Sequence, residues 1–422
     1  MTRTAAEAHG DVSVLVAGGG VAALETALAL RALAPGLVDV ELVSAELHFF
    51  YRPLAVAEPF GAGRVHRWEL DDLARAAGAA FAPGRVAEID AVAHVARLAS
   101  GVEIPYDALV LATGAAPRSA VPGALTFRGP ADVEAMERLL GEIVRGEAKR
   151  IVFAIPTGIV WPLPLYELAL LTATELEARG VSASLTIATS EPSPLALFGA
   201  TASRAVETAL SERGIDVLTT TYPVEVVDRH LACVRAEPLE ADRVVALPRL
   251  YGPDIGGIPQ DTNGFVATDE HGRVHDLADV YAAGDVTSFP IKQGGLAAQQ
   301  ADAVAETIAA AAGASIRPTP FRPVLRALLL TGTAPAFLRV ELAGGRGETS
   351  TAADEALWWP PGKIVGRYLA PFLAELACSR SRRSPARTCS GSSSTRPART
   401  CSAGPASRKV RPARPASPRC VP

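Results

Sequence analysis

Three consecutive glycines, Gly18, Gly19 and Gly20, are the residues whose spacing points most directly to chemistry. With Ala22 and Ala23 they form the pattern G-x-G-x-x-A, which is typical of turns that bind the pyrophosphate of a dinucleotide. In such a turn Gly18 leaves a strand sharply, Gly20 lets backbone N–H groups approach the phosphates, and Ala23 allows the next helix to pack closely. The motif therefore predicts dinucleotide binding; a purely structural turn is the alternative.

The residues around this turn predict the βαβ unit that positions it. Residues 12–17 (VSVLVA) read as a central strand, 21–34 contain no helix breaker, and 38–44 (VDVELVS) read as a second strand. The N-terminus of the helix would add partial positive charge at the phosphates. Glu46 is the expected acceptor for the ribose hydroxyls. In the alternative, Glu46 is a solvated loop acid and Ser44 or water takes that role.

Two later segments, 106–114 (YDALVLATG) and 280–285 (VYAAGD), each end a predicted strand with a short motif. The residues at these strand ends are Ala112, Thr113, Gly114, Gly284 and Asp285. With the glycine turn, these motifs resemble in order and separation those of the pyridine nucleotide–disulfide oxidoreductase superfamily. The resemblance covers roughly residues 12–330 and is nearest the sulfide:quinone oxidoreductase and type II NADH dehydrogenase branch.

This resemblance implies that the dinucleotide is FAD. It gives Asp285 the role of binding the ribityl chain, and it brings Thr113 and Gly114 near the flavin and its phosphates. The backbone at Val86 matches the position that meets the adenine.

The resemblance also gives a role to the segment after Asp285. A helix that begins near Gly294 would point its N-terminus at the flavin pyrimidine. Its dipole, together with the charge of Lys292, would stabilise negative charge on the reduced ring. We therefore expect Lys292 to be catalytic; an ordinary surface lysine is the alternative.

Cysteine usage separates the chain from two branches of that superfamily. Disulfide reductases need a cysteine pair, and sulfide:quinone oxidoreductases need cysteines beside the flavin, but the matching stretch 156–162 (PTGIVWP) has none. Cys233 is the one cysteine before Cys378, and we expect it to be an inert, buried thiol. Neither catalysis by cysteine nor a metal site is expected.

A second strand–turn–helix unit is predicted to begin at Ile151. Its turn, Pro156-Thr157-Gly158, departs from the dinucleotide pattern, so NAD(P)H binding and a scaffold kept for its shape both stay open. Glu191 follows the second strand of this unit and is the candidate acceptor for an NADH ribose.

The predicted fold class is α/β, with two interleaved doubly wound, Rossmann-like domains. The FAD-binding domain is discontinuous, at 10–120 and 245–325, and an NAD(P)-binding-like domain fills 121–244. Residues 326–377 form a small C-terminal element, and 378–422 form a disordered basic tail.

Charge argues against nucleic acid as a partner. Residues 378–422 hold eleven of the 41 basic residues and none of the 45 acidic ones, so the rest of the chain has 30 basic against 45 acidic residues. An acidic body does not suit a polyanion. Because no apolar run suits a bilayer span or a signal peptide, we expect a cytoplasmic protein, with peripheral contact at the inner membrane face as a further option.

Together these features predict an FAD-dependent oxidoreductase that moves two electrons from a donor to an acceptor. NAD(P)H is the leading donor, and a quinone-like or other small molecule is the acceptor. The alternatives are a non-nucleotide donor, or a flavin-bound partner protein without turnover. Trp358 and Trp359 could cover the flavin, line a quinone pocket, touch a membrane or serve domain packing.

The tail generates a testable prediction. After Ala377 aliphatic residues nearly vanish and arginine, serine and proline dominate, so the segment can build no core. It is either an out-of-frame stretch of GC-rich coding sequence, which we favour, or a basic arm that binds anionic partners. Truncation after Ala377 should leave FAD content and melting temperature unchanged, and mild trypsin should remove the tail first. Loss of flavin on truncation would show that the segment belongs to the fold.

Overall fold

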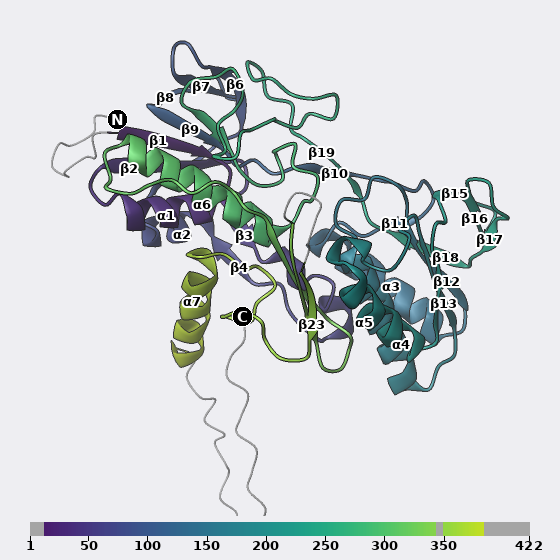
Figure 1. Ribbon diagram of the computed structural model, residues 1–422. Coiled ribbons are helices and arrows are strands. Elements are labelled where there is room, and N and C mark those ends of the chain that lie inside the picture. Colours follow the sequence, from purple (N-terminus) through teal and green to yellow (C-terminus); the bar gives the residue numbers. More distant parts are fainter. Residues whose placement is uncertain (1–11, 343–348, 384–422) are drawn as a thin grey trace, which may run out of the picture.

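The chain forms two α/β lobes, each built around a parallel five-stranded sheet (Figure 1). The structure is a computed structural model that describes residues 12–342 and 349–383. The first sheet has the order β20-β9-β1-β2-β5, and all its neighbours are parallel. Its strands are β1 (Val12–Ala17), β2 (Val38–Ser44), β5 (Ala80–Pro83), β9 (Ala108–Leu111) and β20 (Val280–Ala282).

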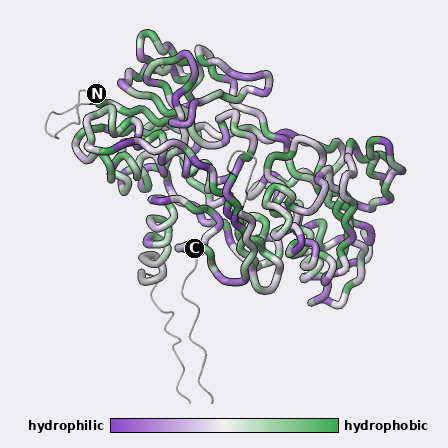
Figure 2. Tube along the Cα trace, viewed as in Figure 1, coloured by the Kyte–Doolittle hydropathy of each residue, from purple (hydrophilic) through white to green (hydrophobic). Residues whose placement is uncertain are grey.

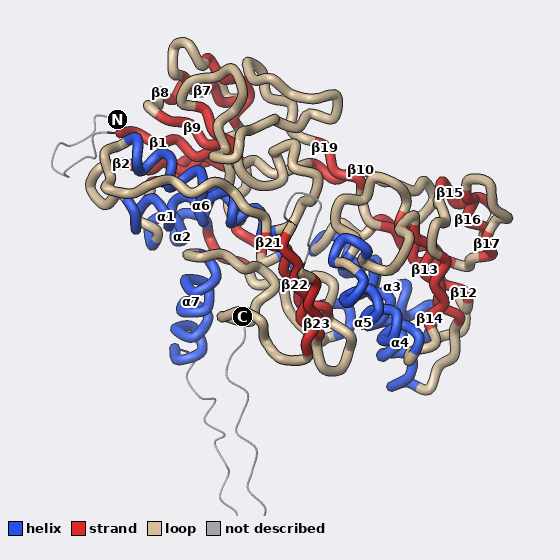
Figure 3. The backbone as a smooth tube through the Cα atoms, in the orientation of Figure 1, coloured by secondary structure: helices blue, strands red, loops and turns tan. Residues whose placement is uncertain are grey.

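Helices cover one face of the first sheet and a small antiparallel sheet covers the other (Figure 3). On β1, Val14 and Val16 pack toward the helices, whereas Leu15 and Ala17 pack toward the antiparallel sheet. Both faces of the strand are therefore buried, which explains its apolar sequence. The covering elements are α1 (Val21–Leu33), α2 (Leu70–Ala76), α6 (Gly294–Ala311), β6 (Val86–Asp90), β7 (Val95–Leu98) and β8 (Glu103–Pro105).

The second lobe repeats this plan with the strand order β11-β18-β12-β13-β14, again parallel throughout. Five of the six residues of its central strand β12 are buried, and hydrophobic residues gather along the central strands of the chain (Figure 2). The strands are β11 (Leu125–Thr126), β12 (Arg150–Ile155), β13 (Ser184–Thr189), β14 (Ile215–Leu218) and β18 (Arg243–Ala246). The helices are α3 (Val133–Val144), α4 (Leu163–Arg179) and α5 (Ala200–Ser211).

An antiparallel pair, β10 (Ala116–Arg118) with β19 (Arg249–Tyr251), joins the two lobes. A three-stranded antiparallel sheet extends the far end of the second lobe (Figure 1). Its strands are β15 (Pro223–Val227), β16 (His230–Cys233) and β17 (Leu239–Glu240). The remaining short elements are β3 (His48–Phe50), β4 (Arg67–Glu69) and four 3-10 turns, Arg52–Leu54, Glu58–Phe60, Pro130–Asp132 and Ala196–Phe198.

The C-terminal element is a three-stranded antiparallel sheet followed by one helix. The sheet packs on α4 of the second lobe and on α6 of the first, so it bridges the lobes. Its elements are β21 (Val324–Leu329), β22 (Ala336–Glu341), β23 (Ser350–Ala353) and α7 (Leu369–Arg383).

The predicted fold class is confirmed, but three expected boundaries fall inside elements. Strand β18 runs across the boundary at 244/245, because Val245 and Ala246 pair within the second sheet. Strand β21 begins before residue 326, and α7 continues past 377 to Arg383. The rest of the predicted tail, 384–422, lies outside the described residues. Within the part of the chain that is described, no helix combines the length and hydropathy needed to cross a membrane.

Candidate active site

The three sequence motifs meet along one edge of the first sheet. Parallel pairing sets Ala17 of β1 beside Leu111 of β9, and Leu111 beside Ala282 of β20. The residues that follow these three strand ends are therefore neighbours at the carboxyl edge, where ligands of open α/β sheets bind. These residues are Gly18, Gly19, Gly20, Ala112, Thr113, Gly114, Gly284 and Asp285.

Two glycines of the first turn have different functions in the structure. Gly18 has a φ of +146°, and a Cβ there would overlap the backbone carbonyl of Ala112. Gly18 is therefore required by the fold. Gly20, in contrast, has a φ of −92°, and a Cβ there would meet no atom within 4 Å. The space at Gly20 is therefore open, which leaves room for the pyrophosphate that the motif predicts.

These residues fit the FAD that the sequence resemblance implies. Helix α1 begins after Gly20 without a side-chain cap and without an acidic residue in its first turn. Its first N–H groups can therefore bind a phosphate. Gly114, with a φ of +75°, also has open space at its Cβ position. A Cβ at Gly284 would stand 3.1 Å from that of Ala22, so the third motif packs closely on the start of α1.

Asp285 follows β20 at this edge, and two nearby cations favour the charged form of its carboxylate. Burial raises the pKa of Asp285, whereas the charges of Lys292 and Arg52 act to lower it. Lys292 is itself buried and donates from Nζ to the backbone carbonyl of Thr287. Its Nζ also lies 4.0 Å from the centre of the Phe265 ring. Burial lowers the pKa of Lys292 to about 8, although Asp285 and Asp261 oppose this shift.

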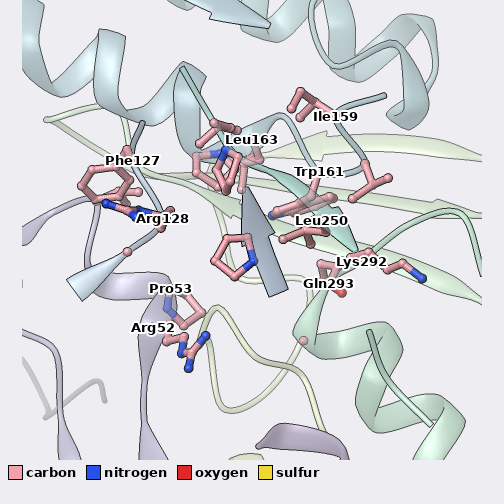
Figure 4. A pocket seen from close by; sticks show the side chains of 18 of the residues that line it. Arg52, Pro53, Phe127, Arg128, Ile159, Trp161, Leu163, Leu250, Lys292 and Gln293 are labelled. Atoms are coloured by element: carbon pink, nitrogen blue, oxygen red, sulfur yellow. The ribbon is translucent and has the colours of Figure 1, made fainter. Parts of the chain in front are cut away.

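A cavity of about 270 Å³ opens beside Asp285, between the two lobes and the C-terminal element. Figure 4 shows labelled side chains from both lobes around it, and Leu328 and Lys363 of the C-terminal element also line it. Most of its wall is apolar. The apolar lining includes Pro53, Val56, Phe127, Ile159, Trp161, Leu163, Leu250 and Leu328. Such a wall suits a small apolar ligand.

The cavity wall also holds a buried ion pair that the sequence did not indicate. Lys363 Nζ lies 2.6 Å from both carboxylate oxygens of Glu167, and both side chains are almost fully buried. The Glu167 carboxylate also accepts a hydrogen bond from the Leu330 N–H at 2.8 Å. Burial raises the pKa of Glu167, and Lys363 opposes that shift. A lysine just after Trp-Trp-Pro-Pro-Gly was the only signal that could have pointed to this pair.

Other predicted residues lie at or near the same edge. Glu46 is exposed, two residues past β2, and its N–H donates to the Ser44 hydroxyl at 3.1 Å. Val86 is buried in β6 under the sheet. Gly294 starts α6, where the side chain of Gln293 accepts the Leu296 N–H. No contact in the described part of the structure tests whether these residues bind FAD, so their ligand roles stay predictions.

The turn of the second lobe differs from that of the first. Strand β12 and α4 are separated by residues 156–162, whereas only Gly18–Gly20 separate β1 from α1. Glu191 follows β13 as predicted, but its carboxylate accepts hydrogen bonds from Tyr166 at 2.7 Å and Thr189 at 3.1 Å. Burial raises the pKa of Glu191. This carboxylate is thus already engaged within the protein.

Two further expectations concern Cys233 and the tryptophan pair. Cys233 lies on β16, away from the cavity lining, and is only half-buried rather than buried. Its pKa is raised by burial, which keeps the thiol protonated.

Trp358 packs edge-on against Phe337, with ring centroids 5.1 Å apart, as domain packing requires, whereas Trp359 is 83% exposed.

The two glycines give a prediction that separates ligand binding from folding. Gly20→Val should fold normally, because its backbone is unstrained and the added side chain meets no protein atom. The same side chain would occupy the phosphate space, so the purified variant should be colourless and take up no FAD. Gly18→Val, which clashes with Ala112, should fail to fold. Circular dichroism and flavin absorbance together check this, and a yellow Gly20→Val protein would refute the assigned phosphate site.

A second prediction ranks two acids. Asp285→Ala should weaken FAD binding at least tenfold, about 1.4 kcal/mol, because it leaves the ribityl hydroxyl that this carboxylate would bind without a partner. Glu46→Ala should have a smaller effect, since water can replace an exposed carboxylate. Titration of apoprotein with FAD measures both constants. Equal losses in the two variants would remove the ranking.

Comparison with known proteins agrees with this geometry. The model of the family described as pyridine nucleotide-disulphide oxidoreductase matches residues 12–310. A sulfide-quinone reductase of Aquifex aeolicus (strain VF5) is 28% identical over 310 residues, which cover 66% of this chain and 69% of that protein.

Solved structures show the same fold. The sulfide:quinone oxidoreductase of Aquifex aeolicus superposes with a TM-score of 0.74 at 22% identity, covering 81% of this chain and 87% of that one. A ferredoxin reductase of Rhodopseudomonas palustris gives a TM-score of 0.61 at 20% identity, covering 78% and 82%. The chain therefore belongs to the pyridine nucleotide-disulphide oxidoreductase family, and it is an FAD-dependent oxidoreductase.

Proposed function

We propose that this flavoenzyme passes two electrons from a non-nucleotide donor to a quinone-like acceptor bound in the cavity beside Asp285. The observation that carries the proposal is the cavity wall, which is apolar except for a few charged groups. A quinone is a planar apolar ring with carbonyl oxygens, and it needs that kind of wall with a polar group at one end. The similarity to a sulfide-quinone reductase supports the same acceptor class.

The chain would hold FAD at the carboxyl edge of the first sheet, with the start of α1 at the pyrophosphate and Asp285 at the ribityl chain. When bound, FAD takes two electrons from one molecule and gives them to another. Lys292 is one of the residues that line the cavity, and its Nζ is engaged by the Thr287 carbonyl and the Phe265 ring. We propose that Lys292 acts by its charge, which balances Asp285 and the site around it.

The buried pair of Lys363 and Glu167 supplies the polar end of the cavity. Two N–H groups of Lys363 are directed at the Glu167 carboxylate, which leaves the third for an acceptor oxygen. Trp359 lies four residues earlier and is 83% exposed. A peripheral position at a membrane, where quinones dissolve, is part of this proposal.

Three features of the second lobe support a donor other than NAD(P)H. Its β12–α4 turn lacks the glycines that bring backbone to a pyrophosphate. Pro164 stands at the start of α4 and has no N–H to offer. Glu191 already accepts the Tyr166 hydroxyl. NAD(P)H remains the competing donor, because the lobe keeps the complete parallel sheet.

The proposal predicts the behaviour of a cavity variant. Ile159→Glu should weaken binding of a short-chain ubiquinone analogue at least tenfold, because a carboxylate in an apolar wall is costly to desolvate. The matched control is Val92→Glu, at a position 96% exposed and outside the cavity lining, and it should bind the analogue normally. Titration with the analogue, monitored by flavin absorbance, measures the dissociation constant for each variant.

A second arm of the experiment tests the donor. Under anaerobic conditions, NADH and NADPH should leave the flavin colour of the wild-type protein unchanged. Rapid bleaching by either nucleotide, or equal quinone affinity in Ile159→Glu and wild type, would contradict the proposal.

A further inference from the structure

The chain between β23 and α7 crosses the site. We call its residues 358–368 the strap. Lys363 reaches from the strap to Glu167 on the second lobe. The Ile364 N–H donates to the Tyr51 hydroxyl of the first lobe at 3.0 Å. Ile364 also packs on the start of α6, where a Cβ on Gly294 would lie 3.3 Å from it. The strap is therefore part of the cavity wall and ties both lobes together.

The end of the strap is held by a carboxylate on α1. Glu25 is fully buried and accepts hydrogen bonds from the Tyr368 and Leu369 N–H groups, each at 2.7 Å. These are the N–H groups at the start of α7, where a negative charge is favourable. The chain passes so close that a Cβ on Gly366 would overlap the Glu25 carboxylate. The position of the strap thus depends on Glu25.

Asp302 on α6, which packs on α1, places a second carboxyl within interaction distance of Glu25. Asp302 Oδ1 is buried and makes no hydrogen bond with the described residues. A buried carboxylate oxygen without a donor is costly, whereas a protonated carboxyl can itself donate. Two adjacent carboxyls in a buried place cannot both be ionised. Asp302 therefore suits the role of the protonated member, beside an ionised Glu25 that caps α7.

We propose that Glu25 and Asp302 form a proton-dependent latch: their shared proton keeps the strap closed over the cavity, and its loss loosens the strap. This property goes beyond the proposed electron transfer and holds whatever the donor and acceptor are. It makes the closure of the site depend on pH through two residues outside the cavity lining.

The charged groups around the pair set the direction of the effect. Burial, followed by the charge of Glu25, raises the pKa of Asp302 to about 8, and Arg367 opposes this. Glu306 on α6 raises it further, although Glu306 also pairs with Arg367 at 3.2 Å. Burial also raises the pKa of Glu25, while its hydrogen bonds to Tyr368 and Leu369 lower it.

The sign of the pH dependence follows from proton binding. In an open strap both carboxyls would be solvated and would titrate near their ordinary values of about 4. Between that range and about pH 8, the closed form holds one more proton than the open form. Closure is therefore strongest in acid, and the opening constant should rise by up to tenfold per pH unit until about pH 8 and then level off.

Hydrogen exchange of the strap amides tests this on the FAD-loaded protein between pH 5 and 9, after correction for the intrinsic exchange rate. We expect the opening constant of the peptide that spans 362–369 to rise with pH in wild type. Asp302→Asn keeps the shape and a donor toward Glu25 but cannot ionise, so its opening constant should lose the rise toward pH 8 that Asp302 causes. Glu25→Gln should be more open at pH 7, because the amide is a poorer cap, and its opening constant should level off at a lower pH than in wild type, because Asp302 loses the charge of Glu25 but not its burial. It serves as a second test if Asp302→Asn does not fold.

Asp242→Asn is the matched control. Asp242 is also a buried carboxylate that accepts two backbone N–H groups, but it lies in the second lobe, and its pKa is lowered. This variant should keep the wild-type slope in the strap. A flat wild-type profile, or a wild-type slope in Asp302→Asn, would overturn the latch. Neither result depends on which donor or acceptor the enzyme uses, so failure of the latch is distinct from failure of the proposed function.

Discussion

The structure depends on one close approach, in which the first turn after β1 lies against the end of β9. Gly18 has no room for a side chain because the Ala112 carbonyl occupies that space, and its φ of +146° is open only to glycine. This contact sets the N-terminus of α1 directly beyond the sheet. From it follow the open space at Gly20, the contact between Ala22 and Gly284, and the placement of Asp285 beside them. A dinucleotide needs backbone that it can reach, and these small residues provide it.

Buried charge, rather than apolar packing alone, fixes how the C-terminal element sits on the two lobes. Lys363 meets Glu167 on α4, and Glu25 on α1 receives the first N–H groups of α7. Buried ion pairs contribute little net stability, because desolvation of the charges offsets their attraction. They are specific, however, since a misplaced partner leaves an uncompensated charge. The pairs therefore determine where the strap lies, and apolar contacts such as Trp358 on Phe337 add to its packing.

The two lobes share one plan but differ in what their first turns can do. In the first lobe Gly20 leaves backbone exposed to a ligand, whereas in the second lobe Trp161 and two prolines lie in the corresponding connection. That connection faces the cavity and provides part of its apolar wall. The β12–α4 connection corresponds to the turn that binds the dinucleotide in the first lobe. In the second lobe it instead contributes to the cavity beside Asp285. The lack of cysteines in the same segment is consistent with this change of use.

The sequence by itself determined the fold class, the strands that carry the motifs and the residues at the carboxyl edge. These features are local, because a buried parallel strand and a glycine turn each leave a pattern within a few consecutive residues. The ion pair of Lys363 with Glu167, the cap that Glu25 places on α7, and the cavity between the lobes were decided only by the tertiary structure. Their members are hundreds of residues apart, and a lysine or glutamate looks the same in sequence whether it is solvated or buried against a partner. Only the packing of α1, α6 and the strap decides which of these charges lose their water.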